Sequence, residues 1–589
     1  MESLRRLSRH SKVRESTTRA GPWPNRMKIS LRTTRKLATR AALLPVLFAS
    51  AFAALGQTGI TVDLNARIGA YKPIYSWFGY DEANYTTTQN GRELLKELRD
   101  LSPVPVYIRA HNLLTTGDGV PALKWSSTNA YTEDAQHQPV YDWKIVDGIF
   151  DAYRDAGVRP MVELGFMPEA LSSHPGPYYV AFPGQIFDSG WAYPPVDYAR
   201  WGELVHRFAE HLVKRYGREQ TSRWYWEVWN EPDIGYWHGS PEDYDRLYDY
   251  AVAGVRAALP EAKVGGPAST GPHNERAGRF LAQFLKHVAE GKSAANGGKV
   301  PLDFISFHAK GAPRVVEGRV RMALDRELSD AADGFAMVSR YPQFAKLPII
   351  LSEADPEGCA ACSAKEHPQN AYRNGPLYPC YTAAALKGLF ELEDEYHVNL
   401  LGMLSWSFEF EGRESFEGFR SLATNGVDKP VLNVFRMAAL LSGDRVRTTS
   451  DGAVSLKSIL ASGVRGEADV DALATRDGNH AGVLLWNYHD DDKPADGSEV
   501  KLTVTGLPAG VHRVLIEHYR IDESHSNSYA VWKAMGSPPH PDEAQTARLK
   551  EAGQLQLLNS PRWVEVQGGK ASLQFPLPRQ ATSLVRLSW

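Results

Sequence analysis

Cysteine is scarce in this sequence. Only three of its 589 residues are cysteine, and Cys359, Cys362 and Cys380 lie together in one loop-like segment. Because the chain has no second Cys-x-x-C pair and only His367 lies near the cysteines, the pattern disfavours a zinc site. In an exported protein we expect one disulfide that pins this loop and one thiol left over. The spacing does not indicate which two cysteines bond.

Long hydrophobic runs and stripes of one charge are missing as well. After residue 56, no stretch approaches the roughly 18 consecutive apolar residues of a membrane-spanning helix. The sequence has no Lys/Arg stripe of the kind that binds nucleic acid or anionic lipid, and no group of acids with the spacing of a calcium loop. These absences disfavour nucleic acid, a membrane surface and a metal ion as partners, so a neutral ligand fits better.

Residues 1–56 have the pattern of a presequence with a signal peptide. Twelve Lys/Arg and two acids come first, and the uncharged apolar run 41–55 follows, with a small-x-small site at 51–53. This order is typical of a secretory signal, and the proline inside the run disfavours an uncleaved membrane anchor. Translation starts at Met1 or at Met27, which opens a conventional Lys/Arg-rich segment. We expect an exported protein, periplasmic or secreted, without membrane association after signal cleavage.

Between residues 71 and 442, short apolar strand candidates alternate with amphipathic helix candidates. This alternation is typical of parallel β/α units. Helical periodicity supports the intervals, as in Val146, Phe150 and Tyr153, which recur at steps of three and four residues. The eight strand candidates predict a closed (β/α)8 barrel and span residues 75–79, 104–109, 159–163, 224–229, 263–266, 303–307, 349–352 and 400–405.

From residue 443 to residue 589, the chain changes to short alternating segments broken by Gly, Pro and Asp. This pattern predicts an antiparallel β-sandwich accessory domain. Residues 57–70, ahead of the barrel, contain the same alternation and are a candidate for one further strand of the sandwich. The predicted fold class is therefore α/β, a (β/α)8 TIM barrel with a C-terminal antiparallel β-sandwich domain. The sandwich strand candidates span residues 481–486, 501–504, 511–519, 571–575 and 583–587.

Two glutamates follow two of the predicted barrel strands. The aromatic segment 224–229 leads into an Asn-Glu-Pro tripeptide with Glu231, and the apolar segment 347–352 leads into Glu353. Because the carboxyl ends of barrel strands face one shared bowl, we expect these side chains to meet. Retaining glycosidases use one carboxyl group as acid/base and a second as nucleophile, and need no cofactor. We predict Glu231 as acid/base, Glu353 as nucleophile, and Asn230 as an amide donor to a sugar hydroxyl.

Further segments match the sequence pattern of one enzyme family. They are residues 107–111, 162–168, 226–232, 304–308, 418–419, 429–430, 485–488, 519–522 and 526–527. Together with the two glutamates, they make the chain resemble glycoside hydrolase family 39, whose best-known members are β-xylosidases and α-L-iduronidases. The resemblance covers about residues 58–589. It implies a retaining mechanism with Glu231 as acid/base and Glu353 as nucleophile, which agrees with the assignment from the strand ends.

The resemblance also implies roles for substrate-binding residues. His111 matches a position that contacts sugar hydroxyls, and His308 matches a position close to the nucleophile; a structural histidine is the alternative for each. Trp406 matches an aromatic floor of the sugar subsite, with core packing as its alternative. Glu409 and Glu411 compete for one position that holds distal hydroxyls, because the spacing here differs from the family pattern.

The sequence departs from the family pattern at the expected pocket wall. Glu353 lies in Ser-Glu-Ala-Asp where many relatives have Thr-Glu and an aromatic residue or asparagine, and His308 is followed by Ala-Lys-Gly where Tyr-Pro is frequent. Both departures weaken any claim about the sugar that is bound. Phe166 is expected to shape the pocket, whereas Glu163, inside a strand, could be a buried structural carboxylate. The cysteine-bearing segment with Arg373 either covers the same wall or is a surface loop.

Three hypotheses follow. The leading one is an exo-acting retaining β-D-xylosidase that releases xylose from the non-reducing ends of xylo-oligosaccharides by double displacement. The second keeps the mechanism but changes the sugar to an α-L-arabinosyl, uronic or glucosyl unit; a uronic acid would require a basic residue, for which Arg109, Lys310 and Arg373 lie near strand ends. The third, a non-catalytic carbohydrate-binding protein, is disfavoured because both glutamates are present. The sequence does not indicate the oligomeric state.

Overall fold

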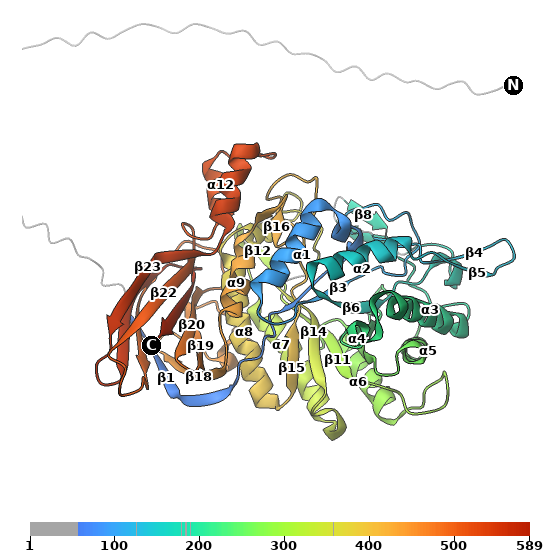
Figure 1. Ribbon diagram of the computed structural model, residues 1–589, viewed down its shortest axis with the longest axis horizontal. Coiled ribbons are helices and arrows are strands. Elements are labelled where there is room, and N and C mark those ends of the chain that lie inside the picture. The colour runs from blue at the N-terminus through green and yellow to red at the C-terminus, as the bar shows by residue number, and fades with distance from the viewer. Residues whose placement is uncertain (1–56, 125, 178, 183–184, 189, 357) are drawn as a thin grey trace, which may run out of the picture. The chain divides into compact units, whose positions relative to one another are not determined.

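The computed structural model describes residues 57–589 except residues 125, 178, 183–184, 189 and 357 (Figure 1). The predicted presequence, residues 1–56, lies outside the described part of the chain. In that described part, no helix combines the length and the apolar character that a membrane crossing would need.

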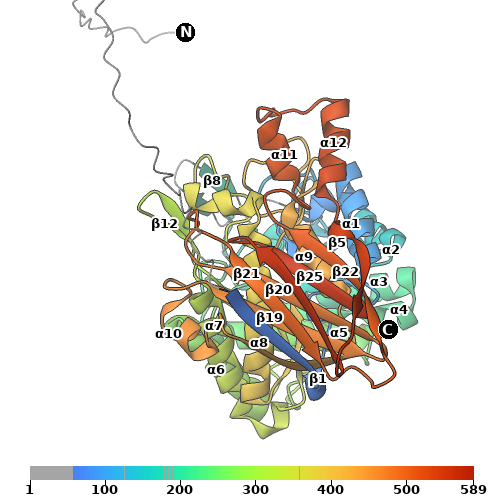
Figure 2. The same ribbon diagram turned by 90° about the vertical axis from the view of Figure 1, so that its left-hand side faces the viewer.

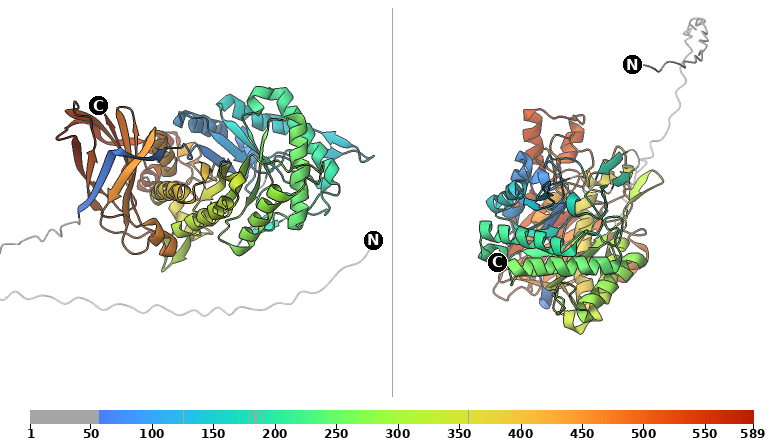
Figure 3. Two further views of the ribbon diagram at one scale, coloured as in Figure 1. Left: turned by 90° about the horizontal axis from the view of Figure 1, so that it is seen from below. Right: turned by 90° about the vertical axis from the view of Figure 1, so that its right-hand side faces the viewer.

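Eight parallel strands form a closed barrel, and the helices lie on its outer side (Figure 3). The strands follow one another around the barrel in sequence order. Between the first and the last strand, the Gly79 amide donates to the Ser405 carbonyl at 2.9 Å and the Ser405 amide donates to the Trp77 carbonyl at 3.0 Å, which closes the ring. All eight predicted strands are confirmed. They are β2 (Trp77–Tyr80), β3 (Tyr107–Ala110), β6 (Arg159–Leu164), β9 (Tyr225–Val228), β10 (Lys263–Ser269), β11 (Phe304–Lys310), β14 (Pro348–Asp355) and β15 (Asn399–Met403).

Local sequence explains where the barrel helices begin and end. In α5 (Pro241–Ala258), Ser240 and Asp243 form a capping box and the proline occupies the first turn. Helix α2 (Lys144–Ala156) buries its predicted apolar stripe and ends at Gly157, whose φ of 79° a glycine adopts without strain. The other helices of the barrel are α1 (Gln89–Leu101), α3 (Tyr198–Tyr216), α4 (Arg218–Thr221), α6 (Glu275–Glu290), α7 (Leu324–Ser339), α8 (Leu377–Tyr396) and α9 (Pro430–Ala439).

The loops that follow the barrel strands carry short hairpins. Since these loops lie at the carboxyl ends of the strands, they surround the mouth of the barrel. The hairpins are β4 (Tyr131–Glu133) with β5 (Pro139–Tyr141), β7 (Tyr179–Phe182) with β8 (Gln185–Asp188), β12 (Arg314–Val316) with β13 (Arg319–Arg321), and β16 (Ala423–Thr424) with β17 (Val427–Asp428).

The loop after β14 contains one disulfide, between Cys359 and Cys362, and Cys380 is a buried free thiol. The predicted disulfide and leftover thiol are thus confirmed. The placement of Cys380 in the same loop was wrong, because this residue lies in α8, where its thiol contacts the Ala581 carbonyl at 3.6 Å. Pro379 made the start of α8 look like a loop, but proline is tolerated in the first turn of a helix.

A second sheet contains nine strands, and its order is β23-β22-β25-β20-β19-β18-β1-β21-β24. Its β1 (Gln57–Ala70) comes from ahead of the barrel and pairs with β18 and β21, so residues 57–70 join this sheet. The pairing of β1 with β21 is parallel, which corrects the prediction of a purely antiparallel sheet. The other strands are β18 (Asp444–Ser450), β19 (Asp469–Asp477), β20 (His480–Tyr488), β21 (Ser498–Thr505), β22 (Arg513–Ile521), β23 (Gln556–Glu565), β24 (Lys570–Leu577) and β25 (Thr582–Ser588).

The two halves of this sheet share one apolar core. Ile60 of β1 and Leu502 of β21 belong to the same buried cluster as Val514 of β22 and Val585 of β25. Strand β24 at one end of the sheet also approaches β23 at the other. The sheet therefore folds over to form the two layers of a sandwich.

Helices interrupt the segment that was predicted to be only sandwich. Besides α10 (Leu456–Ser462), two helices, α11 (Ser528–Ala534) and α12 (Glu543–Gly553), lie side by side beyond the edge of the sheet (Figure 2). Trp532 of α11 and Leu549 of α12 pack on Phe416 and Val427 of the loop after β15. The accessory segment thus contacts the barrel at a loop that follows a strand end.

Candidate active site

The two predicted catalytic glutamates lie at strand ends of the barrel mouth, on two strands that are separated by β10 and β11. Glu231 follows β9, and Glu353 is near the end of β14. The backbone turns sharply after β9, since Trp229 and Glu231 have φ values of 72° and 45°, which residues other than glycine rarely adopt. The Glu231 amide donates to the Ala268 carbonyl of β10 at 2.9 Å and holds this turn. Such strain is common where a side chain must be placed for function.

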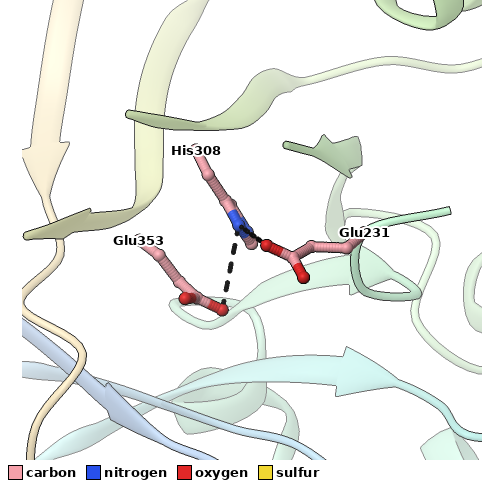
Figure 4. Close-up of side chains that lie close together, drawn as sticks. All are labelled: Glu231, His308 and Glu353. Carbon is pink, nitrogen blue, oxygen red and sulfur yellow. Dashed lines mark hydrogen bonds and ion pairs between the residues drawn. The ribbon is translucent and has the colours of Figure 1, made fainter. Parts of the chain in front are cut away.

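The carboxylates of the two glutamates lie close together (Figure 4). One oxygen of Glu231, one oxygen of Glu353 and one ring nitrogen of His308 all lie within 4.8 Å of one another. Retaining glycosidases hold their two carboxyl groups about 5–5.5 Å apart, whereas inverting enzymes leave about 6.5–9.5 Å for a water molecule. The spacing therefore fits a retaining mechanism.

Lys310, the last residue of β11, places its ammonium group between these carboxylates. Its Nζ lies 2.9 Å from Oε1 of Glu231 and 2.6 Å from Oε2 of Glu353. Nδ1 of His308 lies 2.9 Å from the same oxygen of Glu231. The donor atoms of Glu231, His308 and Glu353 are close enough to hold an ion, but Lys310 already supplies the positive charge at this place. The contacts therefore do not favour a metal site.

Both predicted catalytic carboxylates are ionised in this arrangement. Burial would raise the pKa of Glu231, but the ammonium of Lys310 and the hydrogen bond from His308 lower it to about 2. Burial would also raise the pKa of Glu353, but Lys310, His308 and His111 hold it well below its usual value. An ionised Glu353 suits a nucleophile, whereas an acid catalyst at Glu231 needs a proton.

Arg109, buried in β3, connects Asn230 and Glu353 to two further acids. Its guanidinium contacts Glu227 at 2.5 Å, Glu163 at 2.9 Å and Glu353 at 3.4 Å. It also donates to the side-chain oxygen of Asn230 at 3.0 Å. Because this oxygen is occupied, the amide nitrogen of Asn230 is the end left to donate to a substrate. Glu163 is completely buried, and burial raises its pKa to about 8, as expected of a structural carboxylate.

A cavity of about 340 Å³ opens at the two glutamates. This volume is near the lower end of the range for small-ligand pockets. Five of the predicted site residues line it, namely His111, Asn230, Glu231, Glu353 and Trp406. Its other lining residues are Asp81, Lys124, Ile234, Tyr236, Lys310, Gly358 and Cys359.

Trp406 both lines the cavity and packs against its neighbours. Its ring centroid lies 4.3 Å from that of His111, and the Arg109 guanidinium lies 4.9 Å above the indole. Gly79 makes room for it, since a Cβ at that position would lie 2.5 Å from Cζ3 of Trp406. The indole is therefore fixed in place, as a platform for a sugar ring would need to be.

Asp81 and Lys124 are pocket residues that the sequence analysis missed. Oδ1 of Asp81 lies 2.8 Å from Nδ1 of His111, and its other oxygen pairs with the Lys124 ammonium. Asp81 directly follows β2, so the same strand-end rule that found Glu231 could have found it. Lys124 lies far along a loop, and no pattern in the sequence marks it.

Four predicted site residues do not line the cavity, and their contacts with substrate stay predictions. Phe166 lies behind the wall, with its ring stacked on Tyr236 at 5.5 Å. Glu409 accepts a hydrogen bond from the Gly426 amide at 2.5 Å, and burial raises its pKa to about 7. Glu411 also lies outside the lining residues, so the cavity selects neither of the two glutamates. His308, although completely buried, acts on the pocket through Glu231.

The pH dependence of stability should report on His111. Burial would lower its pKa, but Glu163, Asp81 and Glu353 raise it to about 9. A protonated His111 therefore stabilises the fold fully below its unfolded pKa of about 6.5, and this contribution is lost as the pH rises through 9. Between pH 6.5 and pH 9, we therefore expect the unfolding free energy of the parent protein to fall by about 3 kcal/mol more than that of His111→Asn.

Urea unfolding at pH 6, 7.5 and 9 would measure this difference. The matched control is His480→Asn, because His480 is exposed on β20 and has no acidic partner among the described ion pairs. A parallel pH dependence for the parent protein and His111→Asn would contradict the raised pKa.

The disulfide should affect substrate binding more than the chemical step. Cys359 lines the cavity, and the buried Arg373 donates to the carbonyls of Cys359 at 2.7 Å and Cys362 at 3.1 Å. Because Arg373 holds the loop as well, we expect the double serine variant of the two cysteines to raise KM a few-fold with kcat within twofold. The short ring predicts a stability loss of about 2 kcal/mol. Cys380→Ser is the control that leaves KM unchanged, and a tenfold loss of kcat in the double variant would contradict the prediction.

Comparisons with known proteins agree with this geometry. The model of the family "Glycosyl hydrolases family 39" matches residues 89–569. A beta-xylosidase of Caldicellulosiruptor saccharolyticus is 27% identical over 521 residues, which cover 84% of this chain and 91% of that protein. An alpha-L-iduronidase of Mus musculus is 26% identical over 440 residues, which cover 70% of this chain and 63% of that protein.

A solved structure supports the fold. The crystal structure of a monomeric beta-xylosidase from Caulobacter crescentus CB15 superposes with a TM-score of 0.71 at 21% sequence identity, over 90% of this chain and 99% of that one. The match covers both the barrel and the second sheet. With its family match over most of the chain and two glutamates at retaining distance, the chain belongs to glycosyl hydrolases family 39 and is a glycosidase.

Proposed function

We propose that this glycosidase is exo-acting and releases one sugar at a time from the non-reducing end of an oligosaccharide. The observation that carries the proposal is the pair of carboxylates, Glu231 and Glu353, within 4.8 Å in a single small cavity. Glu353 attacks the anomeric carbon while Glu231 gives a proton to the leaving oxygen. Glu231 then takes a proton from the water that hydrolyses the glycosyl-enzyme, and no cofactor is required.

A β-D-xylosyl unit of a xylo-oligosaccharide is the first candidate for the sugar. Two relatives named beta-xylosidase are 27% identical to this chain, and the matches cover 91% and 79% of their lengths. The small cavity and the fixed Trp406 platform suit one pyranose ring.

A uronic acid is the second candidate, and Lys310 is the observation that favours it. When Glu231 carries the proton that catalysis needs, the ammonium of Lys310 loses one of its two partners. A carboxylate on the sugar would replace that partner. Lys124, the other lysine that lines the cavity, is paired with Asp81 and is less available.

Hydrolysis of a panel of nitrophenyl glycosides by the mature protein tests both candidates. Fast release from the β-xyloside, abolished by Glu353→Ala, would support the first candidate. Release only from a uronide would select the second, and release from another glycoside would keep the mechanism but reject both sugars. If no glycoside were cleaved, the proposed function would be wrong.

We also propose that the protein is exported to the periplasm or the medium. The basic and apolar pattern of residues 1–56 supports this location. The Cys359–Cys362 disulfide supports it too, because disulfides persist mainly in oxidising compartments. N-terminal sequencing of the protein from the producing cell would test it: a mature start near residue 54 is expected, and an intact presequence would contradict it.

A further inference from the structure

The position of Lys310 conflicts with the role of its neighbour Glu231. A general acid must carry a proton before it can give one to the leaving oxygen. With Lys310 at 2.9 Å, the pKa of Glu231 is lowered to about 2, so this carboxylate is ionised at pH 7. The arrangement in the structure therefore cannot provide acid catalysis at neutral pH.

Lys310 is the cation that keeps Glu231 ionised. Among the described residues, no other lysine or arginine lies within ion-pair distance of Glu231. His308 also contacts Glu231, but burial lowers its pKa, so it donates its hydrogen bond as a neutral imidazole. Glu353 acts in the opposite direction, since its negative charge raises the pKa of Glu231.

Glu353, in contrast, has several cationic neighbours. Arg109 lies 3.4 Å from it, His111 3.6 Å and Arg420 3.7 Å, in addition to Lys310. Arg109 and Arg420 are completely buried, so they cannot easily move to another partner. The side chain of Lys310 is 19% exposed and has a flexible stem. Lys310 is thus the neighbour of both carboxylates that is able to move.

The substrate has to enter the space that Lys310 occupies. The leaving oxygen must come within about 2.6–3.2 Å of the carboxyl group of Glu231, and the anomeric carbon must lie between the two carboxylates. An ammonium at 2.9 Å from one and 2.6 Å from the other stands in that gap. When the ammonium moves away from Glu231, burial and the negative charge of Glu353 favour protonation of the Glu231 carboxylate.

We propose that Lys310 is a positioning residue that keeps Glu231 ionised until substrate displaces its ammonium from Glu231, while the contact with Glu353 is kept. Glu231 then takes one proton from solvent, gives it to the leaving oxygen, and recovers one from the attacking water. This inference rests on the proposed function. It differs from the general two-glutamate mechanism because binding and protonation of the acid become one coupled event.

The pH profile of kcat/KM, on the glycoside that the panel identifies, tests the coupling. We expect Lys310→Met to move the alkaline limb to higher pH by at least one unit, since Glu231 no longer faces a cation. Lys310→Arg keeps the charge and should keep the limb of the parent protein. Lys124→Met removes the other pocket lysine, and whatever its rate, its limb should not move. A Lys310→Met profile that superposes on the parent profile would overturn the proposal.

Proton uptake on binding gives a second readout. Titration calorimetry of the released monosaccharide at pH 7, in buffers of different ionisation enthalpy, measures the protons bound with the ligand. The parent protein should take up close to one proton and Lys310→Met close to none. Equal uptake by both proteins would count against the coupling.

A stability cycle tests the ion pair without any substrate. Lys310→Met leaves two buried carboxylates facing each other, so we expect it to lower the Tm. Adding Glu231→Gln to the same chain should restore at least half of that decrease. Glu227→Gln, which removes a buried carboxylate bound to Arg109, is the matched control and should be additive with Lys310→Met. If the effects of Lys310→Met and Glu231→Gln on the Tm were additive as well, the proposal would be overturned. If Lys310→Met does not fold, Lys310→Gln replaces it.

The two proposals fail in distinguishable ways. If no glycoside is cleaved but the cycle shows coupling, the proposed function is wrong and the Lys310 contact stands. If a glycoside is cleaved but neither the pH limb nor the Tm cycle responds to Lys310, the glycosidase stands and the positioning role is wrong.

Discussion

Glu353→Gln is expected to lower kcat by about 10⁵-fold on every glycoside that the protein cleaves. Without the carboxylate, no glycosyl-enzyme can form, and carboxylate oxygens within 4.8 Å of each other leave no room for a water that could attack instead. Steady-state rates on the glycoside that the panel identifies measure the loss. Glutamine keeps the shape of the side chain, so binding of the sugar should persist.

A matched control separates catalysis from packing in that experiment. Glu327 is another completely buried glutamate, and it accepts a hydrogen bond from Tyr381 at 2.5 Å outside the pocket. Glu327→Gln should keep kcat within about tenfold of the parent protein. If Glu353→Gln retained more than a hundredth of the parent rate, Glu353 would not be the nucleophile.

Glu231→Ala is expected to show a loss that depends on the leaving group. A dinitrophenyl glycoside departs without help, so its first step should slow by less than tenfold. An oligosaccharide or alkyl glycoside needs the proton and should slow by about 10³- to 10⁴-fold. Sodium azide should restore turnover of the dinitrophenyl substrate and give a glycosyl azide of retained configuration, because azide needs no general base.

Equal losses for good and poor leaving groups would contradict the acid/base role of Glu231. Glu353→Gln serves as the comparison, since azide cannot give a product of retained configuration there. The configuration of the azide product, read by NMR, therefore distinguishes the two glutamates by an observation other than rate.

The barrel was predictable because its strands are continuous apolar runs between amphipathic helices. In β9, all four residues are buried, and a strand covered on both faces leaves a strong signal in sequence. The same rule located Glu231 and Glu353, since only the order of the strands was needed to bring them to one mouth. The sandwich was harder. Strand β18 is rich in charged and polar residues and β23 is largely exposed, so neither shows clear alternation, and both were missed.

The pocket was only partly predictable, because its ion pairs join residues that are far apart in the chain. Lys124 and Asp81 are separated by 43 positions, and Lys310 and Glu231 by 79. The sequence placed Lys310 near a strand end but could not show that its ammonium lies between two carboxylates, since that depends on side-chain direction. Glu409 has a similar hidden contact, because its place near a strand end predicts a substrate ligand, together with Glu411, but does not show that its carboxylate accepts a hydrogen bond from the Gly426 amide.

Strand β1 has a consequence for the order in which the chain can fold. It lies between β18 and β21, which are made several hundred residues later, and β21 in turn pairs with β24 near the end of the chain. During synthesis, the earliest described segment must therefore wait, with both of its edges unpaired, until almost the whole polypeptide has emerged. Cutting the gene at the boundary near residue 443 would leave the barrel fragment with an unprotected edge strand prone to aggregation, and the other fragment with a gap in its sheet. The barrel and the sandwich differ in architecture, but one cut between them cannot separate them, because β1 precedes the barrel in sequence and belongs to the sandwich sheet.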